Sequence, residues 1–189
     1  MDKKDINEYA DKTYEQVSGW INNCDSKASI MIALIGVFLS IVFTSDYLLK
    51  GITEELKVII GLFSGNSSCR TWGSLILIIL LGLSAFYFIK ALRSLFVVLY
   101  ARLDDSRKEE NPSVSFYKSI GEHSYEDYKQ LVINIPEKKL TEDKLRQVHD
   151  CSKICTQKFL NYNKGVSASK LALAFFGAYI TLFLFINSL

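Results

Sequence analysis

The chain alternates between three uninterrupted apolar runs and stretches in which apolar residues recur at every third or fourth position. The apolar runs cover residues 28–47, 72–89 and 171–189, and the first of them ends around an aspartate, Asp46. About twenty residues at the helical rise span a hydrocarbon core of roughly 30 Å. Each run therefore predicts a transmembrane helix.

Two seams of helical spacing predict that these helices continue beyond the membrane. Steps of three and four residues are typical of an amphipathic helix whose apolar stripe is buried against another helix or a second protomer. The N-terminal seam comprises Ile6, Ala10, Thr13, Val17, Trp20, Cys24, Ala28 and Met31. The C-terminal seam comprises Leu145, Val148, Ser152, Cys155, Phe159, Tyr162 and Val166.

The segment between residues 104 and 140 is the most polar part of the chain. It opens with a charged run at 104–110 and contains both prolines. Short helices are expected at 114–120 and 125–133. Thr141, followed by two acidic residues, predicts the start of the next helix, because a hydroxyl caps a helix and the dipole favours acids in its first turn.

These patterns predict an all-α membrane protein in which three transmembrane helices extend into a cytoplasmic helical stalk. The expected parts are a cytoplasmic amphipathic helix at 1–27, transmembrane helices at 28–48, 72–89 and 169–189, an external loop at 49–71 and a cytoplasmic helical region at 90–168. In the external part, the amphipathic stretch 53–63 is expected to lie on the outer leaflet. Small residues suited to close helix approach are Gly36, Gly82, Ala85, Gly177 and Ala178.

The distribution of basic residues predicts the orientation. Lysine and arginine number four in residues 1–27, three in 48–71 and fifteen in 90–170. The positive-inside rule then places the N-terminus and the 90–170 segment in the cytoplasm. Cations flanking the apolar runs on that side are expected to anchor at lipid headgroups: Lys27, Lys90, Arg93, Lys164 and Lys170.

Composition and motifs argue against catalysis and nucleic-acid binding. The net charge is only +2, and the mixture of 49% hydrophobic and 22% charged residues fits a chain embedded partly in lipid. No phosphate-binding loop, metal-ligand spacing or nucleophile elbow occurs in the sequence. His123 and His149 are far apart, and Cys151 and Cys155 lack a second pair of metal ligands. The cysteines are expected to be buried or neutral thiols, and we expect no enzyme and no metal.

Two stretches resemble the transmembrane effector family of Pycsar, a bacterial anti-phage system that signals through cyclic pyrimidine mononucleotides. The first is Asp25-Ser26-Lys27-Ala28-Ser29 at the entry to the first apolar run. The second begins with the aromatic pair Phe116-Tyr117 and continues through the short helix that holds Tyr125 and Tyr128. It ends with Gln147, Ser152-Lys153-Ile154 and Lys158, before the last run.

The resemblance implies a receptor in the bacterial inner membrane, with several spans and a cytoplasmic N-terminus. A partner cyclase would make cyclic CMP or cyclic UMP on infection, and no other cofactor is implied. The ligand would engage the cytoplasmic part, and the protein, expected to be a homo-oligomer, would then damage the bilayer and cause abortive infection.

Candidate ligand residues follow from the chemistry of a cyclic mononucleotide, which needs a cation for its phosphate and an aromatic face for its base. The candidate cations are Lys27, Lys118, Lys153 and Lys158, and the candidate aromatic residues are Tyr117, Tyr125 and Tyr128. A membrane-interface motif is expected to comprise Asp25, Lys27, Ser29, Lys90, Arg93 and Lys170. Structural alternatives are that Lys27 pairs with Asp25, that Lys153 is merely solvated and that Tyr117 pins a short helix.

Two other functions are compatible with the pattern. One is a membrane scaffold whose stalk recruits a cytoplasmic partner. The other is a holin-like pore former that needs no ligand. Toxicity on expression without any nucleotide favours the pore former, whereas harmless expression with no nucleotide response favours the scaffold.

Overall fold

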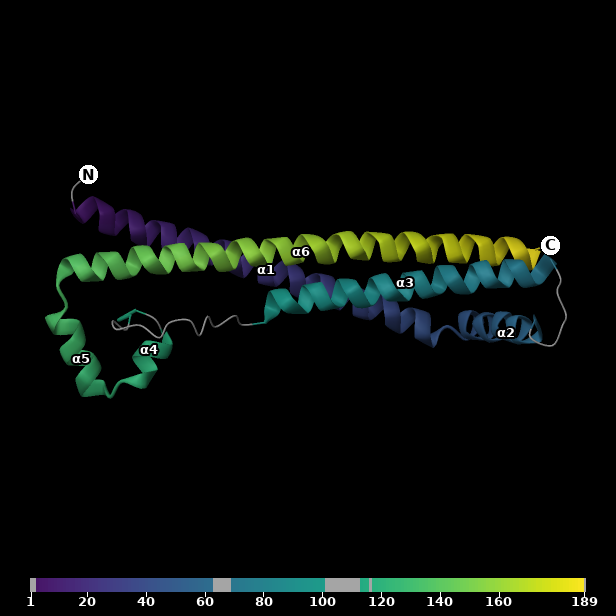
Figure 1. Cartoon of the computed structure of the whole chain (residues 1–189), viewed down its shortest axis with the longest axis horizontal. Coiled ribbons are helices and arrows are strands. Elements are labelled where there is room, and N and C mark those ends of the chain that lie inside the picture. The colour runs from purple at the N-terminus through teal and green to yellow at the C-terminus, as the bar shows by residue number, and fades with distance from the viewer. Residues whose placement is uncertain (1–2, 63–68, 101–112, 116, 189) are drawn as a thin grey trace. The chain divides into compact units, whose positions relative to one another are not determined.

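The computed structural model describes residues 3–62, 69–100, 113–115 and 117–188, and every regular element within them is an α-helix. Figure 1 shows the six helices along the chain. Their bounds are α1 Lys3–Thr44, α2 Asp46–Leu62, α3 Cys69–Leu99, α4 Tyr117–Glu122, α5 Tyr125–Asn134 and α6 Glu137–Ser188. The all-α prediction is confirmed, while the charged run at 104–110 lies outside the described residues.

Three of these helices are long and apolar enough to cross a membrane: α1, α3 and α6. Their 42, 31 and 52 residues exceed the twenty or so that a bilayer needs. Neither proline falls within them, and Pro136 directly precedes α6, where its missing N–H disturbs no helical hydrogen bond. The prediction of three membrane helices that extend well beyond the apolar runs is confirmed. The boundaries between membrane and water stay a prediction.

The chain forms two compact units. We call one the stalk unit, which comprises Met1–Ser26 and Tyr100–Phe159. The other is the membrane unit, which comprises Lys27–Leu99 and Leu160–Leu189. Helices α1 and α6 each contribute residues to both units, whereas α3 belongs almost wholly to the membrane unit and α4 and α5 to the stalk unit.

In the stalk unit, small and medium side chains of α1 form the buried face. Ala10, Val17 and Cys24 lie seven residues apart and are each at most 2% exposed. This spacing brings the same helix face back every two turns, as in a coiled coil. The N-terminal seam is thus confirmed at these positions. Trp20, which the same seam includes, is 56% exposed within one protomer, so its burial against a second protomer stays a prediction.

The start of α6 differs from the prediction. The helix begins at Glu137, one turn before the expected cap at Thr141, and the first backbone bonds run from Lys139 and Leu140 to the Pro136 carbonyl. A helix can start at this point because proline is tolerated before and within its first turn. The expected helix at 125–133 is found as α5, which Ser124 caps by accepting from the N–H of Asp127 at 3.2 Å.

In the membrane unit, aromatic side chains join three helices. Phe38 of α1 lies 5.3 Å from Phe88 of α3 and 5.1 Å from Phe176 of α6, measured between ring centroids. Farther along the unit, Leu77 packs with Tyr179 and Phe183 in a buried cluster. The three apolar runs therefore pack on one another as a bundle, rather than merely sharing a composition.

Helices α3 and α6 approach each other closely at Gly165. A Cβ atom at this position would lie 2.7 Å from Leu95 Cγ and 3.4 Å from the Ala91 carbonyl oxygen. Nearby, the Ser84 hydroxyl donates to the Ala172 carbonyl at 3.0 Å. At Gly36, Gly82 and Gly177 a Cβ would meet nothing within 4 Å in the protomer, so close approach of another helix there stays a prediction.

Helix α2 packs against α3 and α6 at the far end of the membrane unit. A side chain at Gly51 would collide with the Phe183 ring, and the buried Glu55 carboxylate accepts a hydrogen bond from Ser74. The apolar residues Leu56 and Ile60 point away and are exposed. The amphipathic stretch 53–63 thus does form a helix as far as residue 62, and its contact with the outer leaflet stays a prediction.

The packing at Gly165 predicts opposite effects for two Gly→Ala substitutions in α6. Gly165→Ala overpacks the contact with Leu95 and should lower the stability of the protein by about 1–3 kcal/mol. The methyl group added by Gly177→Ala meets open space, so the stability of the protein should stay unchanged or rise by up to about 1 kcal/mol through helix propensity. Thermal unfolding of the full chain in detergent micelles measures both, and equal shifts would show that α3 and α6 do not meet at Gly165.

Candidate functional site

The candidate ligand residues are distributed over four helices. Lys27 lies on the α1 part of the membrane unit, whereas the other six lie in the stalk unit. Tyr117 and Lys118 belong to α4, but their side chains lie outside the described residues. Four side chains in the stalk unit can therefore be compared: Tyr125, Tyr128, Lys153 and Lys158.

Lys158 is held by an acidic residue of α1. Its ammonium lies 2.5 Å from Asp25 Oδ1, and the two side chains are only 11% and 34% exposed. The sequence suggested Lys27 as a structural partner for Asp25, but the structure gives this place to Lys158. Asp25 and Lys158 are 133 residues apart in the chain, so the pair fixes α1 against α6 within the stalk unit.

Near the pair of Asp25 and Lys158, burial also determines the protonation state of a cysteine thiol. Cys155 lies one turn before Lys158 and is 7% exposed. Burial raises the pKa of the Cys155 thiol, against a smaller opposing effect of the Lys158 charge. The thiol therefore stays protonated at neutral pH, in agreement with the expectation of buried, neutral thiols at this position.

Two more polar contacts join α1 to α6 with nearly the same separation along the chain. The Lys144 ammonium lies 2.8 Å from Asp11 Oδ1, and the Thr141 hydroxyl donates to Asn7 Oδ1 at 2.7 Å. Partners in these contacts are 133 and 134 residues apart, as in the pair of Lys158 and Asp25. A constant separation means that the two helices run parallel through the stalk unit.

Tyr128 has a structural contact. Its half-buried side chain donates from the hydroxyl to the Val114 carbonyl oxygen at 3.2 Å. The same short segment is held from α6, because the Asp143 carboxylate accepts from the Ser113 hydroxyl at 2.8 Å and from the Val114 N–H at 3.2 Å. Asp143, expected to serve the helix dipole, thus fastens the chain that leads into α4.

Tyr125 and Lys153 are the candidates that solvent reaches. Tyr125 is 74% exposed, and the Lys129 ammonium lies 5.9 Å from its ring centroid. Lys153 is exposed on α6. A stacked base and a phosphate need an aromatic face beside a cation, and Tyr125 with Lys129 provides one. Lys129 was not among the candidate cations predicted from the sequence.

The membrane-interface residues are exposed throughout. Lys27 and Ser29 lie on α1, Lys90 and Arg93 on α3 and Lys170 on α6, and all five are exposed in the membrane unit. Their anchoring at headgroups stays a prediction. Asp25, the sixth member of the motif, belongs instead to the polar contacts of the stalk unit.

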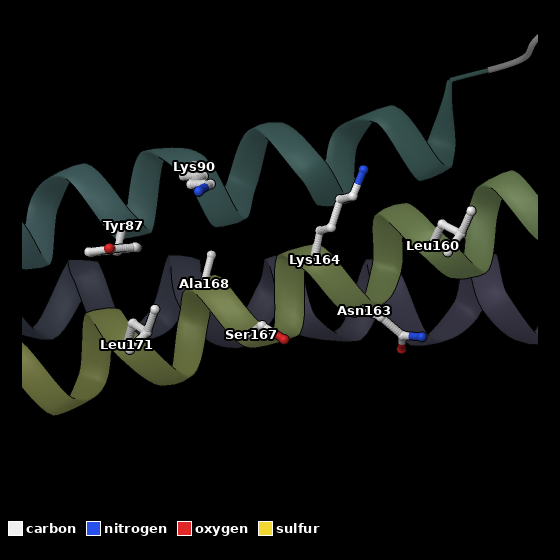
Figure 2. Close-up of a pocket in the computed structure, with 8 residues that line it drawn as sticks. All are labelled: Tyr87, Lys90, Leu160, Asn163, Lys164, Ser167, Ala168 and Leu171. Carbon is white, nitrogen blue, oxygen red and sulfur yellow. The ribbon is translucent and has the colours of Figure 1, made fainter.

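A groove between α3 and α6 brings Lys90 and Lys164 together with the Tyr87 ring. It has a volume of about 380 Å³ and lies within the membrane unit. Figure 2 shows Tyr87 and Lys90 on its α3 side, and Lys164 extending from α6 toward α3. Residues of α6 that line it follow the i, i+3, i+4, i+7 spacing of one helix face: Leu160, Asn163, Lys164, Ser167, Ala168 and Leu171.

The pairing of Asp25 with Lys158 predicts a loss of stability when the charge is removed. Asp25→Asn leaves a largely buried ammonium without its carboxylate and should cost about 1–3 kcal/mol, and adding Lys158→Met should recover part of that loss. Glu8→Gln is the control, because Glu8 pairs with Lys12 in solvent and should leave the melting temperature unchanged. Equal melting temperatures for wild type and Asp25→Asn would contradict the contact.

Comparison with known proteins gives one consistent result. The Pycsar effector protein domain matches residues 9–186, which is nearly the whole chain. The chain is similar to the Pycsar effector protein GmPycTM of Gulbenkiania mobilis, with 32% identity over 175 residues, 88% of this chain and 87% of the relative.

No solved structure matches the chain. The family match over residues 9–186 nevertheless includes residues of every described helix, α1 to α6, and of both compact units. With its three membrane-length helices and this match along its length, the chain is a membrane protein that belongs to the Pycsar effector family.

Proposed function

We propose that this protein is a membrane effector of anti-phage defence that binds cyclic CMP or cyclic UMP and impairs the bacterial inner membrane, causing abortive infection. The observation that carries the proposal is the family match over residues 9–186, which spans the stalk unit and the membrane unit together. The nucleotide would come from a partner cyclase, and the protein would act as a receptor without catalysing a reaction.

The charge distribution supports the orientation that this function requires. Basic residues concentrate in the N-terminal segment and in the segment between the second and third spans, which together build the stalk unit. The positive-inside rule places that unit in the cytoplasm, where a cyclase releases its product. A soluble nucleotide then reaches the stalk unit without crossing the membrane.

Shared helices support coupling between the two units. Both α1 and α6 are single helices with residues in each unit, so a change in their packing in the stalk unit affects segments that continue into the membrane. A ligand shifts such an equilibrium only through a difference in affinity between two states. Exposed aromatic residues on the stalk part of α1, Tyr9 and Trp20, offer a face for a second copy in the proposed homo-oligomer.

For the ligand contacts, we place the base on Tyr125. Lys158 and Tyr128 already hold α1 and the segment before α4, so their removal would disturb the fold as well as any ligand. Tyr125 has an exposed ring with a cation beside it. Lys129 of α5 and Lys153 of α6 are both exposed and are proposed to face the phosphate, together with Lys118 of α4. Tyr117 of α4 is proposed as a further aromatic contact of the base.

The proposal predicts nucleotide-dependent leakage. Liposomes that contain the purified full chain and a quenched dye are titrated with cyclic CMP, UMP, AMP and GMP. Release with one cyclic pyrimidine nucleotide alone is expected, because only a ligand that binds the active state more tightly shifts the equilibrium. Leakage without ligand would favour the pore former, and silence with all four nucleotides would favour the scaffold.

A second prediction concerns the ring of Tyr125. Loss of one stacked base costs about 1–3 kcal/mol, so Tyr125→Ala should raise the nucleotide concentration for half-maximal dye release by about tenfold or more. Tyr14→Ala is the matched control, since Tyr14 is 43% exposed on α1 and belongs to neither the proposed ligand contacts nor the face proposed for a second copy. Full sensitivity of Tyr125→Ala would exclude this residue from the site.

A further inference from the structure

The groove between α3 and α6 has a position and a lining that the proposed nucleotide response does not use. Lys90 directly follows the apolar run at 72–89, and Lys164 and Ser167 precede the run at 171–189. Leu171 and Tyr87 fall within those runs. One end of the groove is therefore lined by residues of the apolar runs, and the other by polar residues that flank those runs. This is the lining expected of a site at the membrane surface.

Two cations lie in the groove without a carboxylate. Lys90 contacts the Tyr87 ring, with its ammonium 5.8 Å from the ring centroid, and Lys164 extends toward α3 (Figure 2). Neither forms an ion pair with a carboxylate in the described part of the chain. The Asn163 amide and the Ser167 hydroxyl add hydrogen-bond donors along the same face of α6. Two positive charges with neutral donors form a suitable environment for a phosphate.

The rest of the lining is apolar and open. Leu160 and Leu171 are 49% and 45% exposed, while Ala168 is buried where the two helices meet. About half of each leucine is covered by no described part of the chain, and both border the predicted membrane surface. An acyl chain can cover them while a phosphate lies beside the two lysines. A free nucleotide would satisfy the charges but would leave this apolar border uncovered.

We propose that this groove binds an anionic phospholipid, with the headgroup phosphate between Lys90 and Lys164 and an acyl chain along the apolar border. Basic pockets between transmembrane helices on the cytoplasmic side are suited to such headgroups. The site is formed by α3 and α6 alone and is independent of nucleotide binding. It links the position of α6 against α3 to the lipid composition of the surrounding leaflet.

The test measures lipid binding by the full chain in detergent, with fluorescent phosphatidylglycerol and phosphatidylcholine as probes. Wild type should prefer phosphatidylglycerol. Each of Lys90→Gln and Lys164→Gln should weaken its binding by about fivefold, and the double variant should lose most of the preference. Lys138→Gln is the matched control, because Lys138 is 80% exposed on the same helix, belongs to the stalk unit and does not line the groove.

Three results would overturn the proposal. One is equal binding of the two lipids by wild type, and another is an equal loss for Lys138→Gln. The third is displacement of phosphatidylglycerol by micromolar cyclic CMP or UMP, which would make the groove a nucleotide site. Thermal unfolding of each variant with and without phosphatidylglycerol provides a second readout: the lipid should raise the melting temperature of wild type and Lys138→Gln, and not that of the double variant. A similar rise for the double variant would also contradict the site.

Discussion

Close approach of long helices through small side chains is the constraint on which this structure depends. In the stalk unit, Ala10 and Cys24 leave α1 near enough to α6 for short polar side chains to meet across the pair. In the membrane unit, the small residues Gly165 and Ala168 likewise bring α6 close to α3. Lipid tails are as apolar as the helices, so the hydrophobic effect does not drive the helices together. Van der Waals contact at such small residues has to stabilise their association.

The polar contacts have a different role in each unit. In the stalk unit they join residues of distant sequence and set the register of two parallel helices, as between Asp25 and Lys158. In the membrane unit buried hydroxyls instead supply single hydrogen bonds between helices, as where Ser84 of α3 donates to the Ala172 carbonyl of α6 and Ser74 of α3 donates to Glu55 of α2. Hydrogen bonds of this kind are enriched between membrane helices because the alternative is an unsatisfied group in hydrocarbon.

Periodicity predicted the helices and the seam of Ala10, Val17 and Cys24, because both depend on local spacing alone. It did not specify the tertiary contacts. Trp20 fits the seam by position, but its side chain is exposed within one protomer. Which glycine permits close approach depends on the facing helix, which favours Gly165 over Gly177. The partner of Lys158 was 133 residues away and had no signal in the sequence.

The constant separation of partners in the stalk unit limits how α1 can move. Contacts at Asn7, Asp11 and Asp25 all require the same axial alignment with α6. Shifting the register by one residue would carry each contact about 1.5 Å along the axis and rotate its side chain by about 100° around it. All three contacts therefore oppose such a shift, and a movement of α1 that leaves α6 in place has to break several polar contacts at once.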